Sequence, residues 1–141
     1  MTNLAIVGSW RIDVSIPGVE QAIVNLATFT SDQTVIVAFA TPSPAAPGQQ
    51  HRFEFFSTAL GSWRVEDDGT VVMTFVSLGA DESGNPAGTH TISAHVTVGS
   101  DGQSWGGPFR IDVASATGAA LGSVQGTTAA TRIVAGPVAS S

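Results

Sequence analysis

The feature that most constrains the fold is a strict alternation of polar and apolar residues over positions 8–14, which read Gly-Ser-Trp-Arg-Ile-Asp-Val. Successive side chains of an extended strand point to opposite faces, so the three apolar residues share one face and the polar residues share the other. The pattern returns, with different spacing, at residues 61–66 and 108–113. Such alternation is typical of antiparallel strands with one buried and one solvated face.

Nine segments of this kind are separated by Gly, Pro, Asn and Asp, and no window has the apolar periodicity of a helix. The sequence therefore predicts an all-β fold in a single domain over residues 1–141: an antiparallel up-and-down β-barrel of 8–10 strands, ending in a flexible tail at 135–141. A barrel is favoured over a sandwich because most connections are of hairpin length and closure leaves no exposed sheet edge. The expected strands are 8–16, 22–30, 34–41, 50–57, 62–66, 70–78, 90–98, 107–115 and 121–134, the last read as one bulged strand or two short ones.

Three connections carry specific expectations. Asp68-Gly69 predicts a type I′ hairpin turn, in which both residues have positive φ. Residues 79–88 are expected to form a long loop. Residues 42–48 contain three prolines, which cannot lie in a central strand, so this segment is expected to be an exposed loop.

Composition excludes several classes of function. Five arginines face eleven acidic residues, giving a net charge of −6 with no basic stripe, so neither nucleic acid nor an anionic membrane is an expected partner. The absence of cysteine, lysine and tyrosine removes thiolate, Schiff-base and tyrosine acid–base chemistry. No cofactor motif is present, and no metal site is expected because His90 and His95 fall on opposite faces of one strand. With no apolar run near the ~18 residues of a membrane span and no visible secretory signal, a cytoplasmic location is expected.

Four of the five arginines have an acidic residue two positions later, which places both on one face of a strand. These pairs predict exposed ion pairs on the outer wall, which contribute ~0–1 kcal/mol each. Arg132 has no such partner and follows an apolar run, so it needs another one, and the face of a tryptophan is a candidate. The four expected pairs are Arg11/Asp13, Arg52/Glu54, Arg64/Glu66 and Arg110/Asp112.

Gly8-Ser9-Trp10 near the start of the chain and Arg132 near its end resemble the calycin superfamily, the lipocalins and their relatives. In those barrels the first strand begins with Gly-x-Trp, and an arginine near the end of the last strand packs across the tryptophan and closes one end. The resemblance requires an even number of strands, whereas nine segments are counted here, so 121–134 would have to be split or two earlier segments merged. It implies a binder of small lipophilic molecules or, less often, an isomerase or cyclase.

If Trp10 faces the interior, strand parity also turns His51 and His90 inward, each near the rim of the barrel. A histidine is the usual general acid or base near neutral pH, so both are candidate catalytic residues; the alternative is that they are rim residues bonded to loop backbone. A further set is expected to line the interior and bind a ligand: Asn25, Phe29, Phe39, Phe53, Phe55, Met73, Phe75 and Phe109.

Three functions remain open at this point. The favoured hypothesis is a small-molecule-binding barrel with an apolar cavity for a hydrophobic or aromatic ligand. The second is a cofactor-independent enzyme of the cyclase or isomerase type, acting on a hydrophobic substrate in the barrel. The third is a barrel filled by its own side chains that serves as a structural or interaction module. A homodimer is a possible assembly, because several strands are apolar on both faces.

Overall fold

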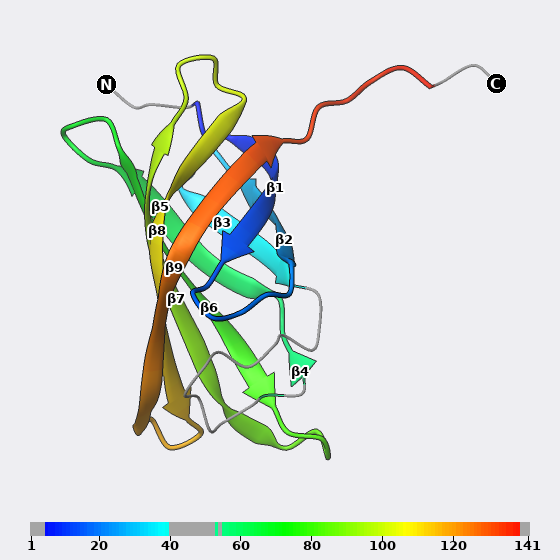
Figure 1. Cartoon of the computed structure of the whole chain (residues 1–141), viewed down its shortest axis with the longest axis vertical. Coiled ribbons are helices and arrows are strands. Elements are labelled where there is room, and N and C mark those ends of the chain that lie inside the picture. The colour runs from blue at the N-terminus through cyan, green and yellow to red at the C-terminus, as the bar shows by residue number, and fades with distance from the viewer. Residues whose placement is uncertain (1–4, 40–52, 54, 139–141) are drawn as a thin grey trace.

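The computed structural model describes residues 5–39, 53 and 55–138, and within these residues it contains strands and no helix (Figure 1). Most strands lie where the alternation predicts them, with ends that differ by a few residues. The strands are Gly8–Ser15 (β1), Ile23–Phe29 (β2), Thr34–Phe39 (β3), Phe55–Phe56 (β4), Ala59–Val65 (β5), Val71–Ala80 (β6), Pro86–Val98 (β7), Ser104–Ser115 (β8) and Ala120–Arg132 (β9).

Eight of the strands close into an antiparallel up-and-down barrel, which confirms the predicted fold class. Each strand of the ring pairs with the next one, with β3 paired to β5 and β6 to β7, and β9 pairs with β1 to close the barrel. The ninth strand, β4, lies outside this ring and adds to the end of β6. In Figure 1 the first and last strands lie side by side, with both chain termini at one end of the barrel.

The even strand count is reached through β4 and β5, which pair with the same edge of β6. Phe56 lies opposite Gly79, whereas Leu60 lies opposite Val76. Four steps along the chain between β4 and β5 therefore match three steps along β6, which defines a bulge of one residue. Ser57 holds this bulge, because its N–H donates to the Leu78 carbonyl and its own carbonyl accepts the hydroxyl of Ser77. The last predicted segment is thus one strand, β9, and the ring is even because β4 is a separate strand outside it.

Two predicted connections are wrong in detail. At the β5–β6 hairpin only Gly69 has a positive φ, of 86°, and its N–H donates to the Glu66 carbonyl. This is a type I turn followed by a left-handed glycine, not a type I′ turn. The β6–β7 connection is only residues 81–85, because the carboxylate of Asp81 accepts two backbone N–H groups and closes a tight turn.

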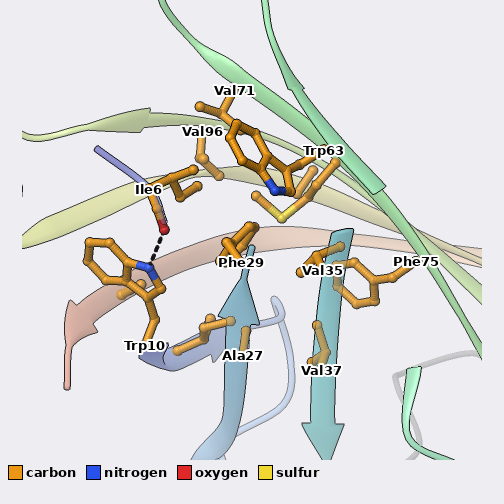
Figure 2. Close-up of a cluster of buried hydrophobic side chains, with 14 of the residues drawn as sticks. Ile6, Trp10, Ala27, Phe29, Val35, Val37, Trp63, Val71, Phe75 and Val96 are labelled. Atoms are coloured by element: carbon orange, nitrogen blue, oxygen red, sulfur yellow. Dashed lines mark hydrogen bonds between the residues drawn. The ribbon is translucent and has the colours of Figure 1, made fainter. Parts of the chain in front are cut away.

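The barrel end that carries both termini is packed solid, and we call it the tryptophan end. Trp10, Phe29, Trp63 and Trp105 are buried there, with edge-to-face ring pairs at centroid distances of 6.0–6.4 Å. Figure 2 shows Ile6, from the segment before β1, next to Trp10, where its carbonyl accepts the indole N–H of Trp10 at 2.8 Å. Such aromatic side chains bury large areas, so this cluster forms much of the core.

Arg132 connects the termini at the same end. Its guanidinium Cζ lies 4.3 Å from the centroid of the Trp10 ring. Its Nε donates to the Gly102 carbonyl and its Nη1 to the Val7 carbonyl, each at 2.8 Å, and Nη2 donates to the Ala5 carbonyl. One side chain thus joins the segment before β1, the end of β9 and the β7–β8 turn.

The other arginines in the described residues form the predicted surface pairs. Nitrogen–oxygen distances are 3.7 Å for Arg11 and Asp13, 2.9 Å for Arg64 and Glu66, and 2.8 Å for Arg110 and Asp112. All six side chains are substantially exposed, which confirms a solvated outer wall at these positions. The predicted Arg52/Glu54 pair lies outside the described residues.

Candidate functional site

A partly open cavity of about 90 Å³ occupies the half of the barrel away from the tryptophan end. Its wall contains no charged group at neutral pH, and Asn25, His90 and Thr128 are its polar side chains. The hydroxyl of Thr128 is already bonded to the Gly107 carbonyl, at 2.9 Å. The other lining residues are apolar: Ile12, Val14, Ile16, Ile23, Phe29, Val37, Phe39, Phe56, Met73, Phe75, Ile92, Ala94, Trp105, Phe109, Ile111 and Val124.

Four rings gather where the cavity approaches the end of the barrel near β4, and we call this group the mouth cluster: Phe39, Phe53, Phe56 and His90. The His90 ring lies 4.9 Å from Phe53 and 4.8 Å from Phe56, and Phe56 lies 6.3 Å from Phe39, between centroids. Phe53 lies directly over Gly79, so close that a Cβ at this glycine would fall 2.0 Å from the ring. Phe53 therefore packs on the bare backbone of Gly79, and the mouth cluster depends on the absence of a side chain at this glycine.

His90 is held in apolar surroundings. The residues opposite it on β6 and β8 are Ser77 and Val113, and the rings of Phe53 and Phe56 flank it. Among the described residues, no hydrogen-bond partner of the His90 ring is found and no charged side chain contacts it. Desolvation lowers the pKa of His90 from its ordinary value of 6.5 to about 4. His90 is therefore neutral at pH 7, and it lies in the cavity wall as a hydrogen-bonding group without charge.

The depressed pKa predicts a loss of stability in acid. Between pH 6.5 and pH 4 the unfolded chain binds a proton at His90 that the folded chain excludes, so the free energy of unfolding falls as the pH falls through this window. Below the window both states are protonated and the loss is complete. For this partly exposed ring we expect a contribution of about 2–3 kcal/mol. Urea unfolding of the wild type and of His90→Gln between about pH 7 and about pH 4 measures it as the difference between the two curves.

His95 provides the matched control, because it lies on the same strand but is exposed on the outer wall, where its Nε2 contacts the Thr70 hydroxyl at 2.6 Å. His95→Gln removes an exposed imidazole from the same strand and so controls for the loss of a histidine as such. A His90→Gln variant that loses stability in acid as steeply as the wild type would contradict the assignment to His90.

The structure brings together most of the residues that the sequence placed in the interior. Phe53 is buried in the mouth cluster, next to the cavity. Phe55 was expected to face inward, and this is wrong: its side chain is 54% exposed and Phe56 faces the cavity instead. The expected alternation therefore fails between Phe53 and Phe55, and the bulge at Ser57 reverses the parity of β4 relative to β5. His51 lies outside the described residues. The predicted residues that line the cavity are Asn25, Phe29, Phe39, Met73, Phe75, His90 and Phe109.

Sequence reasoning missed two large cavity residues, Phe56 and Trp105. Trp105 precedes the predicted start of its strand at 107, but β8 begins at Ser104 and turns the indole inward. Extending the alternation of residues 107–115 backwards by one step would have found it. Phe56 had no such signal, because its direction depends on a bulge that is fixed by β6.

Comparisons with known proteins add no family. No protein-family model matches the chain, and no curated protein or solved structure is significantly similar to it. Within the described residues there is no helix of the length and apolarity that crossing a membrane requires. The same residues contain no group of three or more histidine and acidic side chains placed to hold a metal ion.

Proposed function

We propose that the protein binds a small, neutral, apolar or aromatic molecule in the barrel cavity, entering past the mouth cluster. The observation that carries the proposal is the difference between the two halves of the barrel. One end is packed by Trp10, Trp63 and Ile6, whereas the other half contains a partly open cavity with an almost wholly apolar wall. Concave sites with an apolar lining and a few polar groups are the usual form of small-molecule sites.

The lining also limits the ligand. Burying a charge in a wall without an opposite charge is costly, so a carboxylate or an ammonium group is disfavoured inside the cavity. Asn25 and neutral His90 each offer a hydrogen bond to a single polar group on the ligand. The volume of about 90 Å³ is smaller than the apolar cavity of about 150 Å³ that holds benzene in another protein, so the ligand is limited to a short aliphatic chain or to one aromatic ring that extends into the open mouth.

The enzyme hypothesis is the weaker alternative. His90 is the one titratable side chain in the described cavity wall. A general base is most effective when its pKa lies near the working pH, and a pKa of about 4 makes His90 a poor base at pH 7. The resemblance to the calycins, carried by Gly8, Trp10 and Arg132, fits a binding protein as well as it fits an enzyme. The cytoplasmic location that we propose rests on the sequence alone.

Filling the cavity tests the proposal. Ala94 lines the cavity, so Ala94→Leu should occupy it and lower the affinity for a bound ring at least about tenfold, while stability changes by no more than about 1–2 kcal/mol. We would titrate phenol, benzaldehyde and indole, following the melting temperature and, for phenol and benzaldehyde, also the tryptophan fluorescence, to which Trp105 in the cavity wall contributes. A ligand that binds only the folded protein raises that temperature with concentration.

Ser93→Leu is the control, because Ser93 is the neighbouring residue on β7 and faces outward. It should bind the probes like the wild type. If no neutral probe raises the melting temperature, or if Ala94→Leu binds a probe as tightly as the wild type, the cavity is not the binding site. The hypothesis of a barrel filled by its own side chains is then favoured. Benzoate should bind more weakly than benzaldehyde if a charge is excluded.

A further inference from the structure

The three tryptophans of the chain differ in how their indole N–H groups are bonded. The N–H of Trp10 donates to the Ile6 carbonyl at 2.8 Å, and that of Trp63 donates to the Thr30 carbonyl at 3.0 Å. Trp105 is also buried, with 4% of its surface exposed, but its N–H has no hydrogen-bond partner among the described residues. It is the one fully buried side-chain nitrogen or oxygen of those residues that lacks a partner.

A buried N–H without an acceptor is unfavourable, because it has lost its bonds to water, and nearly all buried polar groups in folded proteins are bonded. The neighbouring rings do not replace an acceptor. Trp10 and Phe29 lie edge-to-face with Trp105, at centroid distances of 6.0 Å, and a contact between an N–H and an aromatic face is only a weak hydrogen bond. The N–H of Trp105 therefore retains its capacity to bind an acceptor.

Trp105 lies at the boundary between the tryptophan end and the cavity. Its ring packs against Trp10 and Phe29, and it also lines the cavity, as Phe29 does, whereas Trp10 and Trp63 do not line it. Trp105 and Phe29 thus belong to the inner end of the cavity, away from the mouth cluster. The tryptophan whose N–H lacks a partner is therefore the one that a bound molecule can contact.

We propose that the N–H of Trp105 binds a hydrogen-bond acceptor of the ligand at the inner end of the cavity, so that the barrel selects neutral aromatic aldehydes or ketones. This inference rests on the proposed binding function and specifies its ligand class. An indole N–H can only donate, so it selects an acceptor, whereas the amide of Asn25 both donates and accepts and does not distinguish the two. A carbonyl oxygen supplies the acceptor without a charge, which the apolar wall disfavours.

Benzaldehyde and styrene form a matched pair of probes. Both carry a planar substituent on one benzene ring, which ends in a carbonyl oxygen in benzaldehyde and in a methylene group in styrene. Because the chain has no lysine, benzaldehyde forms no Schiff base with a side chain. The rise of the melting temperature with probe concentration gives the affinity of each probe for the wild type and for each variant.

Trp105→Phe removes the N–H and leaves the same additional space for both probes. The ratio of the benzaldehyde affinity to the styrene affinity should therefore fall about fivefold or more, which is the effect of an ordinary hydrogen bond. Phe109→Leu is the control, because Phe109 lines the cavity from the same strand and its truncation removes no hydrogen-bonding group. This variant should keep the wild-type ratio, although both affinities may shift together. The melting temperature without a probe verifies that each variant is folded.

The wild type allows a second measurement that needs no folded variant. Proton–nitrogen spectra separate the three indole N–H groups, and a new hydrogen bond moves the proton resonance downfield. Benzaldehyde should move the resonance of Trp105 downfield more than styrene does, and it should slow the exchange of this proton with water. The N–H groups of Trp10 and Trp63 are already bonded to carbonyls and should respond little to either probe.

The outcomes separate this inference from the proposed function. If neither probe raises the melting temperature, the proposed function fails and this inference fails with it. If both probes bind but the ratio is unchanged in Trp105→Phe, or if styrene shifts the Trp105 resonance as much as benzaldehyde does, the cavity binds apolar rings without this hydrogen bond and only this inference is overturned. An equal fall of the ratio in Phe109→Leu would assign the change to cavity size and would overturn it too.

Discussion

Replacing Gly107 by alanine should lower the free energy of unfolding by about 3–5 kcal/mol, or prevent folding, because there is no room for a methyl group at this position. Gly107 faces inward on β8, where the chain passes close to β7. A Cβ there would lie 2.1 Å from the His95 carbonyl oxygen and 2.9 Å from the Cα of Val96. Both obstructing atoms belong to the backbone, so no side-chain rotation relieves the contact. The strands themselves must separate.

The location makes the separation costly. β7 and β8 pair at Ala94 with Phe109 and again at Thr97 with Gly106, so Gly107 lies inside a ladder that is fixed on both sides. Pro108, which follows it, has no N–H to donate to β7. The backbones approach where the hydrogen-bond ladder is interrupted, and only a residue without a side chain allows this. Moving them apart would disturb Trp105 and Phe109, which are buried on the same strand.

Thermal and urea unfolding of Gly107→Ala measure the loss, and Gly136→Ala is the control. Gly136 is exposed beyond β9, and a Cβ there meets no atom within 4 Å. Its substitution should change the free energy of unfolding by less than about 0.5 kcal/mol. A melting temperature of Gly107→Ala equal to that of the wild type would mean that β7 and β8 separate freely, and the argument from close approach would fail.

The fold could be predicted from the sequence because it depends on a local pattern. The alternation at residues 8–14 places Trp10 and Ile12 inward, and the same pattern places Phe109 inward; all three are buried. Period-2 alternation specifies a face for each side chain without any knowledge of the partner strand. Turn residues divide the chain independently of tertiary contacts, so the number and order of the strands could also be predicted closely.

The details of the candidate site were less predictable because they depend on contacts between distant residues. The direction of Phe55 and Phe56 is set by the bulge at Ser57, which is stabilised by Ser77 and Leu78 on β6. The position of Phe53 depends on Gly79, more than twenty residues later, which leaves space for its ring. Neither relation produces a local pattern. Volume is also not encoded locally, so the sequence could name lining residues but could not say that a cavity remains between them.

The second large effect is expected at Arg132. Replacing it by alanine should lower the free energy of unfolding by about 3–4 kcal/mol, which corresponds to a melting temperature about 10 °C lower. Hydrogen bonds from a charged donor contribute about 1.5–3 kcal/mol each where they are shielded from water. Arg132 makes three such bonds to backbone carbonyls and also covers the Trp10 ring, although its partial exposure reduces the sum.

The contacts of Arg132 are not local, which is why their loss should exceed that of an ordinary surface arginine. The Val7 and Ala5 carbonyls belong to the segment before β1, more than 120 residues away in the chain. Without the guanidinium both carbonyls lose the bonds that Arg132 makes to them, and the segment that carries the fully buried Ile6 loses this attachment to β9. The tryptophan end should then open first, so hydrogen exchange at residues 5–10 should increase more than exchange in β6 and β7.

Two further variants separate charge from geometry. Arg132→Lys keeps the positive charge but cannot donate in three directions from a planar group, so it should recover less than half of the loss. Arg64→Ala removes an exposed arginine whose partner is Glu66 and should cost less than about 1 kcal/mol. If Arg132→Lys were as stable as the wild type, a single charge above Trp10 would suffice and the fork of carbonyl bonds would not matter. If instead Arg64→Ala and Arg132→Ala were equally destabilised, Arg132 would be only another surface charge, and the closure of this end would have to rest on Ile6 and the tryptophans alone.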